Sequence, residues 1–345
     1  MCNIAGYIGT KPAAPILIEM MRKQEAFDAG FFTGIATIHE GKIHYAKVVG
    51  NLDTLLSTTD AASLPGTIGF IHGRTPGGPG EDREWAHPFT TERDGIVESA
   101  IASNGVFRFF KARIAEHIAI AEKLLQDGYE FKSAFYCPER PMHLANGNTV
   151  QNNDVLCQLT TQKIRSGMDA VSAIAEATCE FPAERVSVLL SVTEPDAICW
   201  ARMNYPMHLN FVSHGAYLAT TPIAFPEDAG EPFLLPALSA GKVTKDSLFM
   251  KPFTNPPATV APLDSKVYHD VYDMVYTKLH EEEGVTLYTS GDSTPFFEDA
   301  DLKPNGAVKY RVLYDINRRE PIKFSLGEKV CQHNGRTAPQ FIMHL

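Results

Sequence analysis

The first nine residues, Met-Cys-Asn-Ile-Ala-Gly-Tyr-Ile-Gly, constrain the fold most strongly. Cys2 follows the initiator methionine, whose removal we expect, and its removal would leave an α-amine and a thiol on one residue. A thiol with a pKa near about 8.5 and an α-amine with a pKa near about 7.7–8.0 exchange protons readily at neutral pH, so the amine can act as base for the thiol. The apolar spacing that follows predicts a strand that holds this terminus inside a domain. Judged alone, Cys2 is more simply an incidental cysteine beside an N-terminal strand.

Composition and charge exclude several classes of protein. The chain has 345 residues with 44% hydrophobic content, enough for one large domain or two ordinary ones. Its formal net charge of −10 disfavours nucleic acid or an anionic membrane as a partner. Six cysteines without C-x-x-C pairs indicate neither a zinc site nor a disulfide framework, and we expect no metal and no other cofactor. With no secretion signal and no apolar run near about 18 residues, a cytoplasmic location is expected.

Periodicity predicts the secondary structure of the first part of the chain. Short alternating runs predict strands, and apolar residues at helical spacing predict helices. The expected strands cover residues 4–8, 34–38, 42–49, 67–72 and 96–102, and the expected helices cover residues 12–22 and 110–127.

The middle of the chain continues with helices at 154–166 and 170–178 and strands at 186–192, 197–201, 209–212 and 217–220. Hairpin spacing without steady alternation of strand and helix predicts antiparallel sheets covered by helices. The fold class expected from the residues is therefore α+β.

A proline-rich stretch over residues 226–262 predicts a wrapped linker before a second region. We expect a first domain over residues 1–245, a linker over 246–263 and a C-terminal interaction module over 264–345. In that module Asp264 is expected to cap a helix at 265–283, followed by a helix at 308–317 and a strand-like tail, which is compatible with a small winged-helix-like appendage. A stripe formed by Tyr268, Tyr272 and Tyr276 favours packing on a neighbouring surface.

Two loops carry residues suited to amide chemistry. Arg74 ends a buried strand on a glycine-rich loop, which suits bidentate capture of a carboxylate, although an ion-paired loop arginine is an alternative. Asn104-Gly105 ends another strand, where an amide N–H₂ and a backbone N–H could stabilise an oxyanion; a plain Asn-Gly turn is the alternative. Gln151 to Asp154 precede a helix and are most simply its N-terminal cap.

Together and in this order, these stretches resemble class II glutamine amidotransferase domains, which are N-terminal nucleophile hydrolases. The likeness is greatest to the glutaminase domain of glucosamine-6-phosphate synthase, and it covers about residues 1–245. The matching segments are Met1-Cys2-Asn3-Ile4-Ala5-Gly6 (Asn3 replaces a glycine of the family), His72-Gly73-Arg74, Ala86-His87-Pro88, Asn104-Gly105, Gly128-Tyr129-Glu130-Phe131 and residues 217–221.

The resemblance implies a four-layer αββα sandwich and release of ammonia from glutamine for a partner synthase. It implies that Cys2 is the nucleophile, that Asn104 and Gly105 donate to the oxyanion, and that Arg74 binds the substrate α-carboxylate. The remaining substrate-binding residues expected from it are Thr75, His87, Asn152 and Asp154. A synthase partner or a homo-oligomer is expected, and no membrane.

Three departures leave the substrate open. The family pattern Arg-x-x-Thr becomes Arg74-Thr75-Pro76-Gly77, and an early Tyr-Arg-Gly becomes Phe27-Asp28-Ala29. The aspartate that pairs with the substrate ammonium falls on Asn152, with Asp154 two residues later. The alternatives are a hydrolase of a different amide and a catalytically weak amino-acid sensor that signals through residues 264–345.

Overall fold

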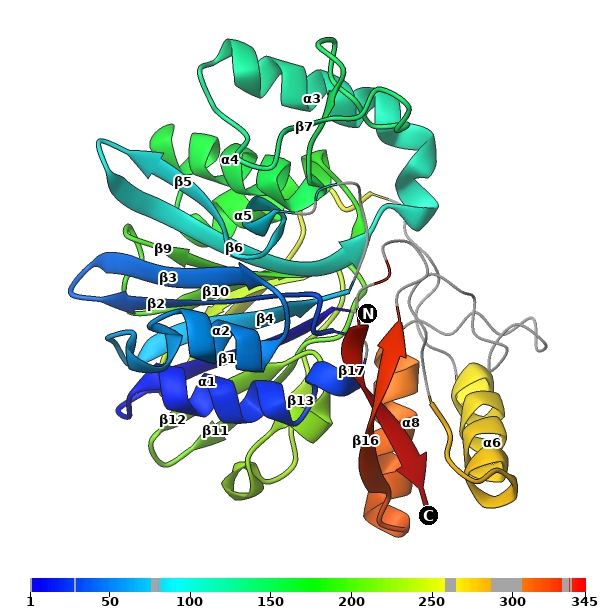
Figure 1. Cartoon of the computed structure of the whole chain (residues 1–345). Helices are drawn as coiled ribbons and strands as arrows, with labels where there is room; N and C mark the ends of the chain where they lie inside the picture. Colours follow the sequence, from blue (N-terminus) through cyan, green and yellow to red (C-terminus); the bar gives the residue numbers. More distant parts are fainter. Residues whose placement is uncertain are drawn as a thin grey trace.

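The computed structural model describes residues 2–27, 29–75, 80, 82–257, 265–286, 306–330, 335 and 337–345. Within them, two antiparallel sheets lie face to face and helices cover their outer faces (Figure 1). The expected combination of antiparallel sheets and helices is confirmed. Met1, Asp28, Pro76, Gly77, Asp264 and Cys331, on which parts of the sequence predictions rest, lie outside the described residues.

The first sheet has seven strands and carries the N-terminus in its interior. The strand β1 (Asn3–Gly9) lies between β12 (Gly215–Ala219) and β4 (Ile68–Arg74), with all its pairings antiparallel. The sheet is completed by β2 (Phe32–His39), β3 (Lys42–Val49), β11 (His208–Val212) and β13 (Phe233–Leu234). Because β1 pairs on both sides, the chain start is held by two ladders of backbone hydrogen bonds.

The second sheet has six strands in the order β15-β14-β10-β9-β6-β5. Their bounds are β5 (Phe89–Arg93), β6 (Ile96–Val106), β9 (Glu184–Ser191), β10 (Ile198–Arg202), β14 (Ser239–Val243) and β15 (Leu248–Pro252). Two predictions differ here. The strand expected to end at Ala102 continues through Asn104 and Gly105 to Val106, and part of the expected linker is the edge strand β15. Its proline is tolerated because an edge strand has one unpaired side.

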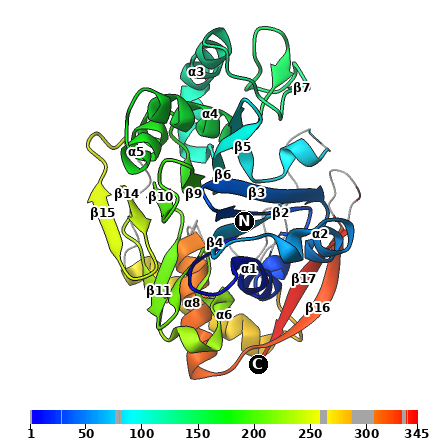
Figure 2. The same cartoon turned by 90° about the vertical axis from the view of Figure 1, so that its left-hand side faces the viewer.

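Three apolar cores separate the layers (Figures 1 and 2). The helices α1 (Ala13–Arg22) and α2 (Leu52–Thr58) pack on the outer face of the first sheet. Trp200, Phe70 and Ile4 belong to the core between the two sheets. The helices α3 (Ile114–Gln126), α4 (Asn152–Arg165) and α5 (Ala170–Glu180) cover the second sheet.

Short elements join these layers. They are the 3₁₀ turns η1 (Glu25–Phe27), η2 (Ala61–Ser63), η3 (Arg83–Trp85), η4 (Arg108–Arg113), η5 (Pro222–Ala224) and η6 (Glu227–Ala229), and the two-residue strands β7 (Phe135–Tyr136) and β8 (Asn148–Thr149). The first turn of the helix expected at 110–127 is the 3₁₀ turn η4, and the α-helix begins at Ile114.

The C-terminal residues form two helices, α6 (Ser265–Glu281) and α8 (Gly306–Arg319), and a hairpin of β16 (Lys323–Val330) and β17 (Thr337–His344). Val271, Val275, Leu313 and Ile316 are at the centre of their shared core. The tyrosine stripe faces α8: Tyr268 donates to Asp315 at 2.6 Å and Tyr276 donates to Glu320 at 3.1 Å. Phe27 of η1 belongs to the same core, so these residues also pack against the sandwich.

Candidate active site

Cys2 lies at the end of β1 where several candidate residues meet. In the sheet, Asn3 pairs with Gly73 and Ile4 pairs with His72, so the start of β1 lies beside the end of β4. The Cys2 Sγ is 3.6 Å from Thr75 Oγ1, and Cys2 is half-buried. The fold thus places a partly accessible thiol next to the expected carboxylate-binding loop.

Arg74 ends β4 with its guanidinium between two aromatic rings. Its Cζ atom lies 4.9 Å from the centre of the Phe32 ring and 5.6 Å from that of Trp85, and Nη1 donates to the Trp85 carbonyl at 3.2 Å. Burial lowers the pKa of Arg74 to about 10, and the charge of Cys2 acts in the opposite direction. The guanidinium therefore remains charged at neutral pH, in a fixed plane, as carboxylate recognition requires.

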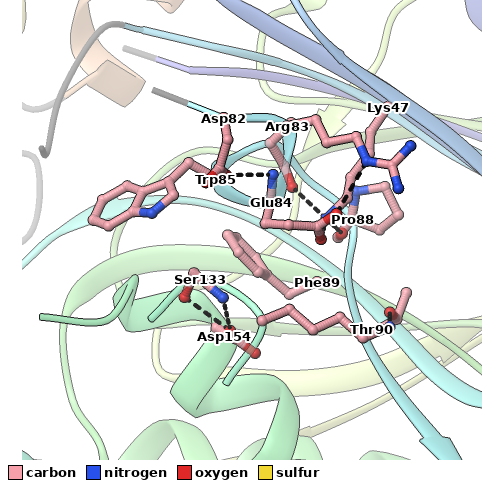
Figure 3. A network of polar contacts seen from close by, with 12 residues as sticks. Lys47, Asp82, Arg83, Glu84, Trp85, Pro88, Phe89, Thr90, Ser133 and Asp154 are labelled. Atoms are coloured by element: carbon pink, nitrogen blue, oxygen red, sulfur yellow. Dashed lines mark hydrogen bonds and ion pairs between the residues drawn. The ribbon is translucent and has the colours of Figure 1, made fainter. Parts of the chain in front are cut away.

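The segment after η3 is held by a buried lysine (Figure 3). The Lys47 ammonium forms an ion pair with Glu84 at 2.9 Å and lies 3.4 Å from both the Ala86 and the Pro88 carbonyl oxygens. Burial lowers the pKa of Lys47, and the Glu84 carboxylate partly restores it. These contacts fix the backbone on both sides of His87.

Two buried histidines connect the sheets. His72 Nε2 faces the Ser103 carbonyl at 3.2 Å and must donate its proton to it. Asn153 accepts from Arg185 at 3.3 Å, which turns its amide N–H₂ toward His87 Nε2, also at 3.3 Å. We therefore assign the His87 proton to Nδ1. The centres of the two imidazole rings are 3.8 Å apart.

Both imidazoles are neutral at physiological pH. Burial, and then the positive charge of Arg74, lowers the pKa of His72 to about 3. Burial, and then His72, Arg74 and Lys47, lowers the pKa of His87 well below its ordinary value. Neutral rings of fixed tautomer provide directional donors and acceptors without adding charge beside Arg74.

Asn104 and Gly105 lie near the end of β6, next to Ser103 and hence next to the His72 contact. Asn104 is 1% exposed, and its Nδ2 atom has no hydrogen-bond partner among the described residues. A Cβ atom at Gly105 would lie 2.4 Å from Arg185 Cβ, so the approach of β9 excludes any larger residue. A buried donor without an acceptor is the feature expected of an oxyanion hole before substrate binds.

The residues predicted at the start of α4 have different environments in the structure. Gln151 caps the helix by accepting from the Asn153 N–H, as expected, and Asn152 is the half-buried first helical residue. Asp154 accepts from the Ser133 N–H at 3.0 Å and from Ser133 Oγ at 2.8 Å (Figure 3), and it also accepts from Gln158 at 3.1 Å. Burial raises the pKa of Asp154, and these hydrogen bonds act against that shift. The carboxylate is therefore engaged in holding the loop before α4.

The strand ends thus bring Cys2 and Thr75 into contact and join the Arg74 strand, through His72, to the strand of Asn104 and Gly105. His87 belongs to the same cluster through its contact with the His72 ring. Asn152 and Asp154 stay predictions as substrate ligands. Asn153, which contacts His87, and Lys47 were not singled out from the sequence. Asn153 lies in the segment interpreted as a helix cap, where only its neighbours Asn152 and Asp154 were predicted to bind substrate.

Two further observations concern cofactors and membranes. Within the described ranges, no group of three or more His, Cys, Asp or Glu side chains could hold a metal ion. The helices in the same ranges include none with the length and apolar character needed to cross a membrane.

Curated relatives share the amidotransferase name. The chain is 26% identical over 255 residues to glutamine–fructose-6-phosphate aminotransferase (isomerizing) of Pyrococcus horikoshii, covering 73% of this chain and 38% of that protein. It is 29% identical over 229 residues to the Rhizobium leguminosarum enzyme of that name, covering 65% and 32%. The match thus spans about a third of the length of these relatives, and no protein-family model matches the chain.

Solved structures share the fold. The Bacillus subtilis glutamine phosphoribosylpyrophosphate amidotransferase, complexed with ADP and GMP, superposes with a TM-score of 0.59 at 16% identity, covering 82% of this chain and 58% of that one. An allosteric regulatory enzyme of purine biosynthesis gives 0.58 at 14% identity, covering 97% and 67%. At these identities the likeness concerns the fold alone.

Proposed function

Because the curated relatives confirm the resemblance to class II glutamine amidotransferase domains, we propose that this chain releases ammonia from the amide of glutamine with Cys2 as nucleophile. The observation that carries the proposal is that three groups meet at one end of the sandwich: the thiol, the buried Arg74 guanidinium, and the Asn104 amide, whose Nδ2 has no hydrogen-bond partner among the described residues. The layers of helix, sheet, sheet and helix support the four-layer αββα architecture of this class.

The chemistry follows from the groups present. After Met1 is removed, the α-amine of Cys2 accepts the thiol proton and the thiolate attacks the amide carbon of glutamine. The Asn104 amide and the Gly105 N–H stabilise the oxyanion of the tetrahedral intermediate. Its collapse transfers the proton to the departing nitrogen, which leaves as ammonia, and water then hydrolyses the thioester to glutamate.

Arg74 orients the substrate. Its guanidinium plane is set by the Phe32 and Trp85 rings, so it can donate two parallel hydrogen bonds to the α-carboxylate. Thr75, which contacts the Cys2 thiol, and His87, which contacts the His72 ring, are further candidates for substrate binding. For the substrate amine the half-buried Asn152 is preferred to Asp154, whose carboxylate already accepts from Ser133 and Gln158. The released ammonia needs an acceptor bound by a further domain or subunit. We assign the binding of this acceptor to a partner synthase.

The C-terminal residues are proposed to form a separate module that docks on the sandwich. Its core is largely its own, and Phe27 is its principal contribution from the first domain. The acidic charge of the chain argues against DNA as a ligand of this module.

The proposal is tested by ammonia release from glutamine with wild-type protein, Cys2→Ala and Cys179→Ala. Cys179 is another partly buried free cysteine, on α5, and serves as the matched control. We expect activity in the wild type and in Cys179→Ala and none in Cys2→Ala. Activity retained by Cys2→Ala would reject the assignment.

The same assay separates the alternatives. Turnover of other amides, but not glutamine, would indicate a different substrate for the same nucleophile. Saturable binding of glutamine without any ammonia release would indicate the sensor function.

A further inference from the structure

A helix near the C-terminus touches the residue next to the proposed nucleophile. The Tyr310 hydroxyl, on α8, donates to Asn3 Oδ1 at 3.3 Å, and both residues are buried: Asn3 is 0% exposed and Tyr310 is 4% exposed. Asn3 is the residue at which the sequence departs from the glycine of the family pattern. A glycine there would offer no side chain to α8.

The orientation of the Asn3 amide is fixed by a second partner. Its Nδ2 donates to the Gln24 carbonyl at 2.6 Å, which leaves Oδ1 as the acceptor that faces Tyr310. The side chain thus bridges the turn after α1 to α8. Because an unsatisfied buried polar group is costly, loss of either partner weakens the hold on Asn3.

The hairpin of the same module reaches the other side of the site. Ala338 of β17 packs with Phe31, Phe32 and Trp85, and the rings of the last two flank the Arg74 guanidinium. The module therefore contacts both the start of β1 and the Phe32 and Trp85 rings beside Arg74.

We propose that Tyr310 is a positioning residue for Cys2, acting through Asn3. This inference rests on the function proposed above and deepens it, because the C-terminal module then completes the hydrolase site. Cys2 lies before β1 begins at Asn3, and among the described residues its Sγ has one hydrogen-bond partner, Thr75 Oγ1 at 3.6 Å. A chain end stays ordered only where it is tied down, so the anchoring of Asn3 decides where the thiol lies.

The test compares Tyr310→Phe, Asn3→Ala and their combination with Tyr276→Phe. Tyr276 is a matched control because its hydroxyl also donates within the module, to Glu320 just after α8, without reaching β1. Two quantities are measured: kcat and KM for glutamine, and the rate of alkylation of Cys2 by iodoacetamide, followed by mass spectrometry of the N-terminal peptide. The alkylation rate does not depend on turnover.

For Tyr310→Phe we expect about a fivefold fall in kcat with little change in KM, as for loss of one neutral hydrogen bond. Alkylation should accelerate several-fold, because a loosened Cys2 is more exposed. The double variant should match Asn3→Ala, because the alanine already removes the contact with Tyr310.

Tyr310→Phe indistinguishable from Tyr276→Phe in both quantities would overturn the inference, as would additive effects in the double variant. If wild-type protein shows no glutaminase activity but Tyr310→Phe still accelerates alkylation, the proposed function fails and the positioning role stands. Should Asn3→Ala fail to fold, the comparison of the two tyrosine variants decides.

Discussion

Two polar clusters lie toward opposite ends of β1, and they differ in how fully they are paired. Near Cys2, Asn104 Nδ2, His72 Nδ1, His87 Nδ1 and Arg185 Nε are buried without a hydrogen-bond partner among the described residues. Near the other end, the Tyr7 hydroxyl contacts His214 Nδ1 at 3.2 Å, and His214 Nε2 contacts Asp228 at 3.0 Å.

This difference in hydrogen bonding distinguishes the proposed binding site from a cluster that only stabilises the fold. The Tyr7 cluster has the Tyr-His-Asp order of a proton relay, yet its members satisfy one another and join the β11–β12 turn to β1. In the Cys2 cluster several groups have no partner among the described residues, and that is costly unless a ligand or water supplies one. Both ring nitrogens of His117 are also buried without a described partner, so unmet hydrogen bonds support the proposed site only together with the thiol and Arg74 beside them.

After Cys2→Ala itself, the largest expected effect is that of Asn104→Ala. If its amide is an oxyanion donor, kcat for glutamine should fall by about 10²–10³. The folded state should be unharmed, because Nδ2 has no described partner to lose. Steady-state kinetics give the fall in kcat, and urea denaturation shows whether the variant is still folded. A loss of folding stability that accounts for the loss of kcat would contradict the role of Asn104 as oxyanion donor.

The neutral histidines predict how stability depends on pH. The unfolded imidazole of His72 binds a proton below about pH 6.5, whereas the folded one does so only near the pKa of about 3. The unfolded state therefore binds more protons as pH falls between these values, and stability is lost at about 1.4 kcal/mol per pH unit for this group. In urea denaturation from pH 6 to pH 4, His72→Gln should lose stability less steeply than wild type. Equal slopes would mean that His72 is charged in the folded protein.

A smaller effect is expected for Arg74→Lys. The charge is kept, but the planar donors stacked between Phe32 and Trp85 are lost. We expect KM for glutamine to rise about tenfold, equivalent to about 1.4 kcal/mol, with a lesser change in kcat. Use of an amide that lacks an α-carboxylate should be unaffected, which makes such a substrate the internal control.

The smallest effect tests the paired cluster. Tyr7→Phe removes the hydroxyl that accepts from the Lys11 N–H and donates to the His214 carbonyl, and stability should fall by about 1 kcal/mol. Glutaminase activity should be unchanged. A substantial loss of kcat without loss of stability would show that this cluster also belongs to the site.

Local patterns predicted much of the fold. The strand at the N-terminus, the hairpin of β2 and β3, and helices α1, α4 and α5 follow from periodicity with small shifts at their ends. The strand β15 was not predicted, because the prolines after residue 226 indicated a linker and an edge strand carries few of the sequence signals of a central strand. Asn104 was expected just after a strand, whereas it lies within β6, because the sequence does not reveal how far β9 extends beside it.

Contacts between residues far apart in the chain could not be predicted from the sequence. Asn153 reaches His87 across 66 positions and Tyr310 reaches Asn3 across 307, and no local signal marks either residue. A single polar residue in an apolar helix face such as that of α8 is ordinarily a packing feature. The hydrogen bond from Tyr310 to Asn3 can be recognised only when the packing of α8 on the sandwich is known.

The most direct test of the central claim is mass spectrometry of protein mixed with glutamine and quenched in acid during turnover. A γ-glutamyl thioester should be found on the peptide that begins with Cys2, now without Met1, and it should be absent from every other cysteine-containing peptide. Ammonia release accompanied by an unmodified Cys2 peptide, or an adduct on another cysteine, would contradict the account.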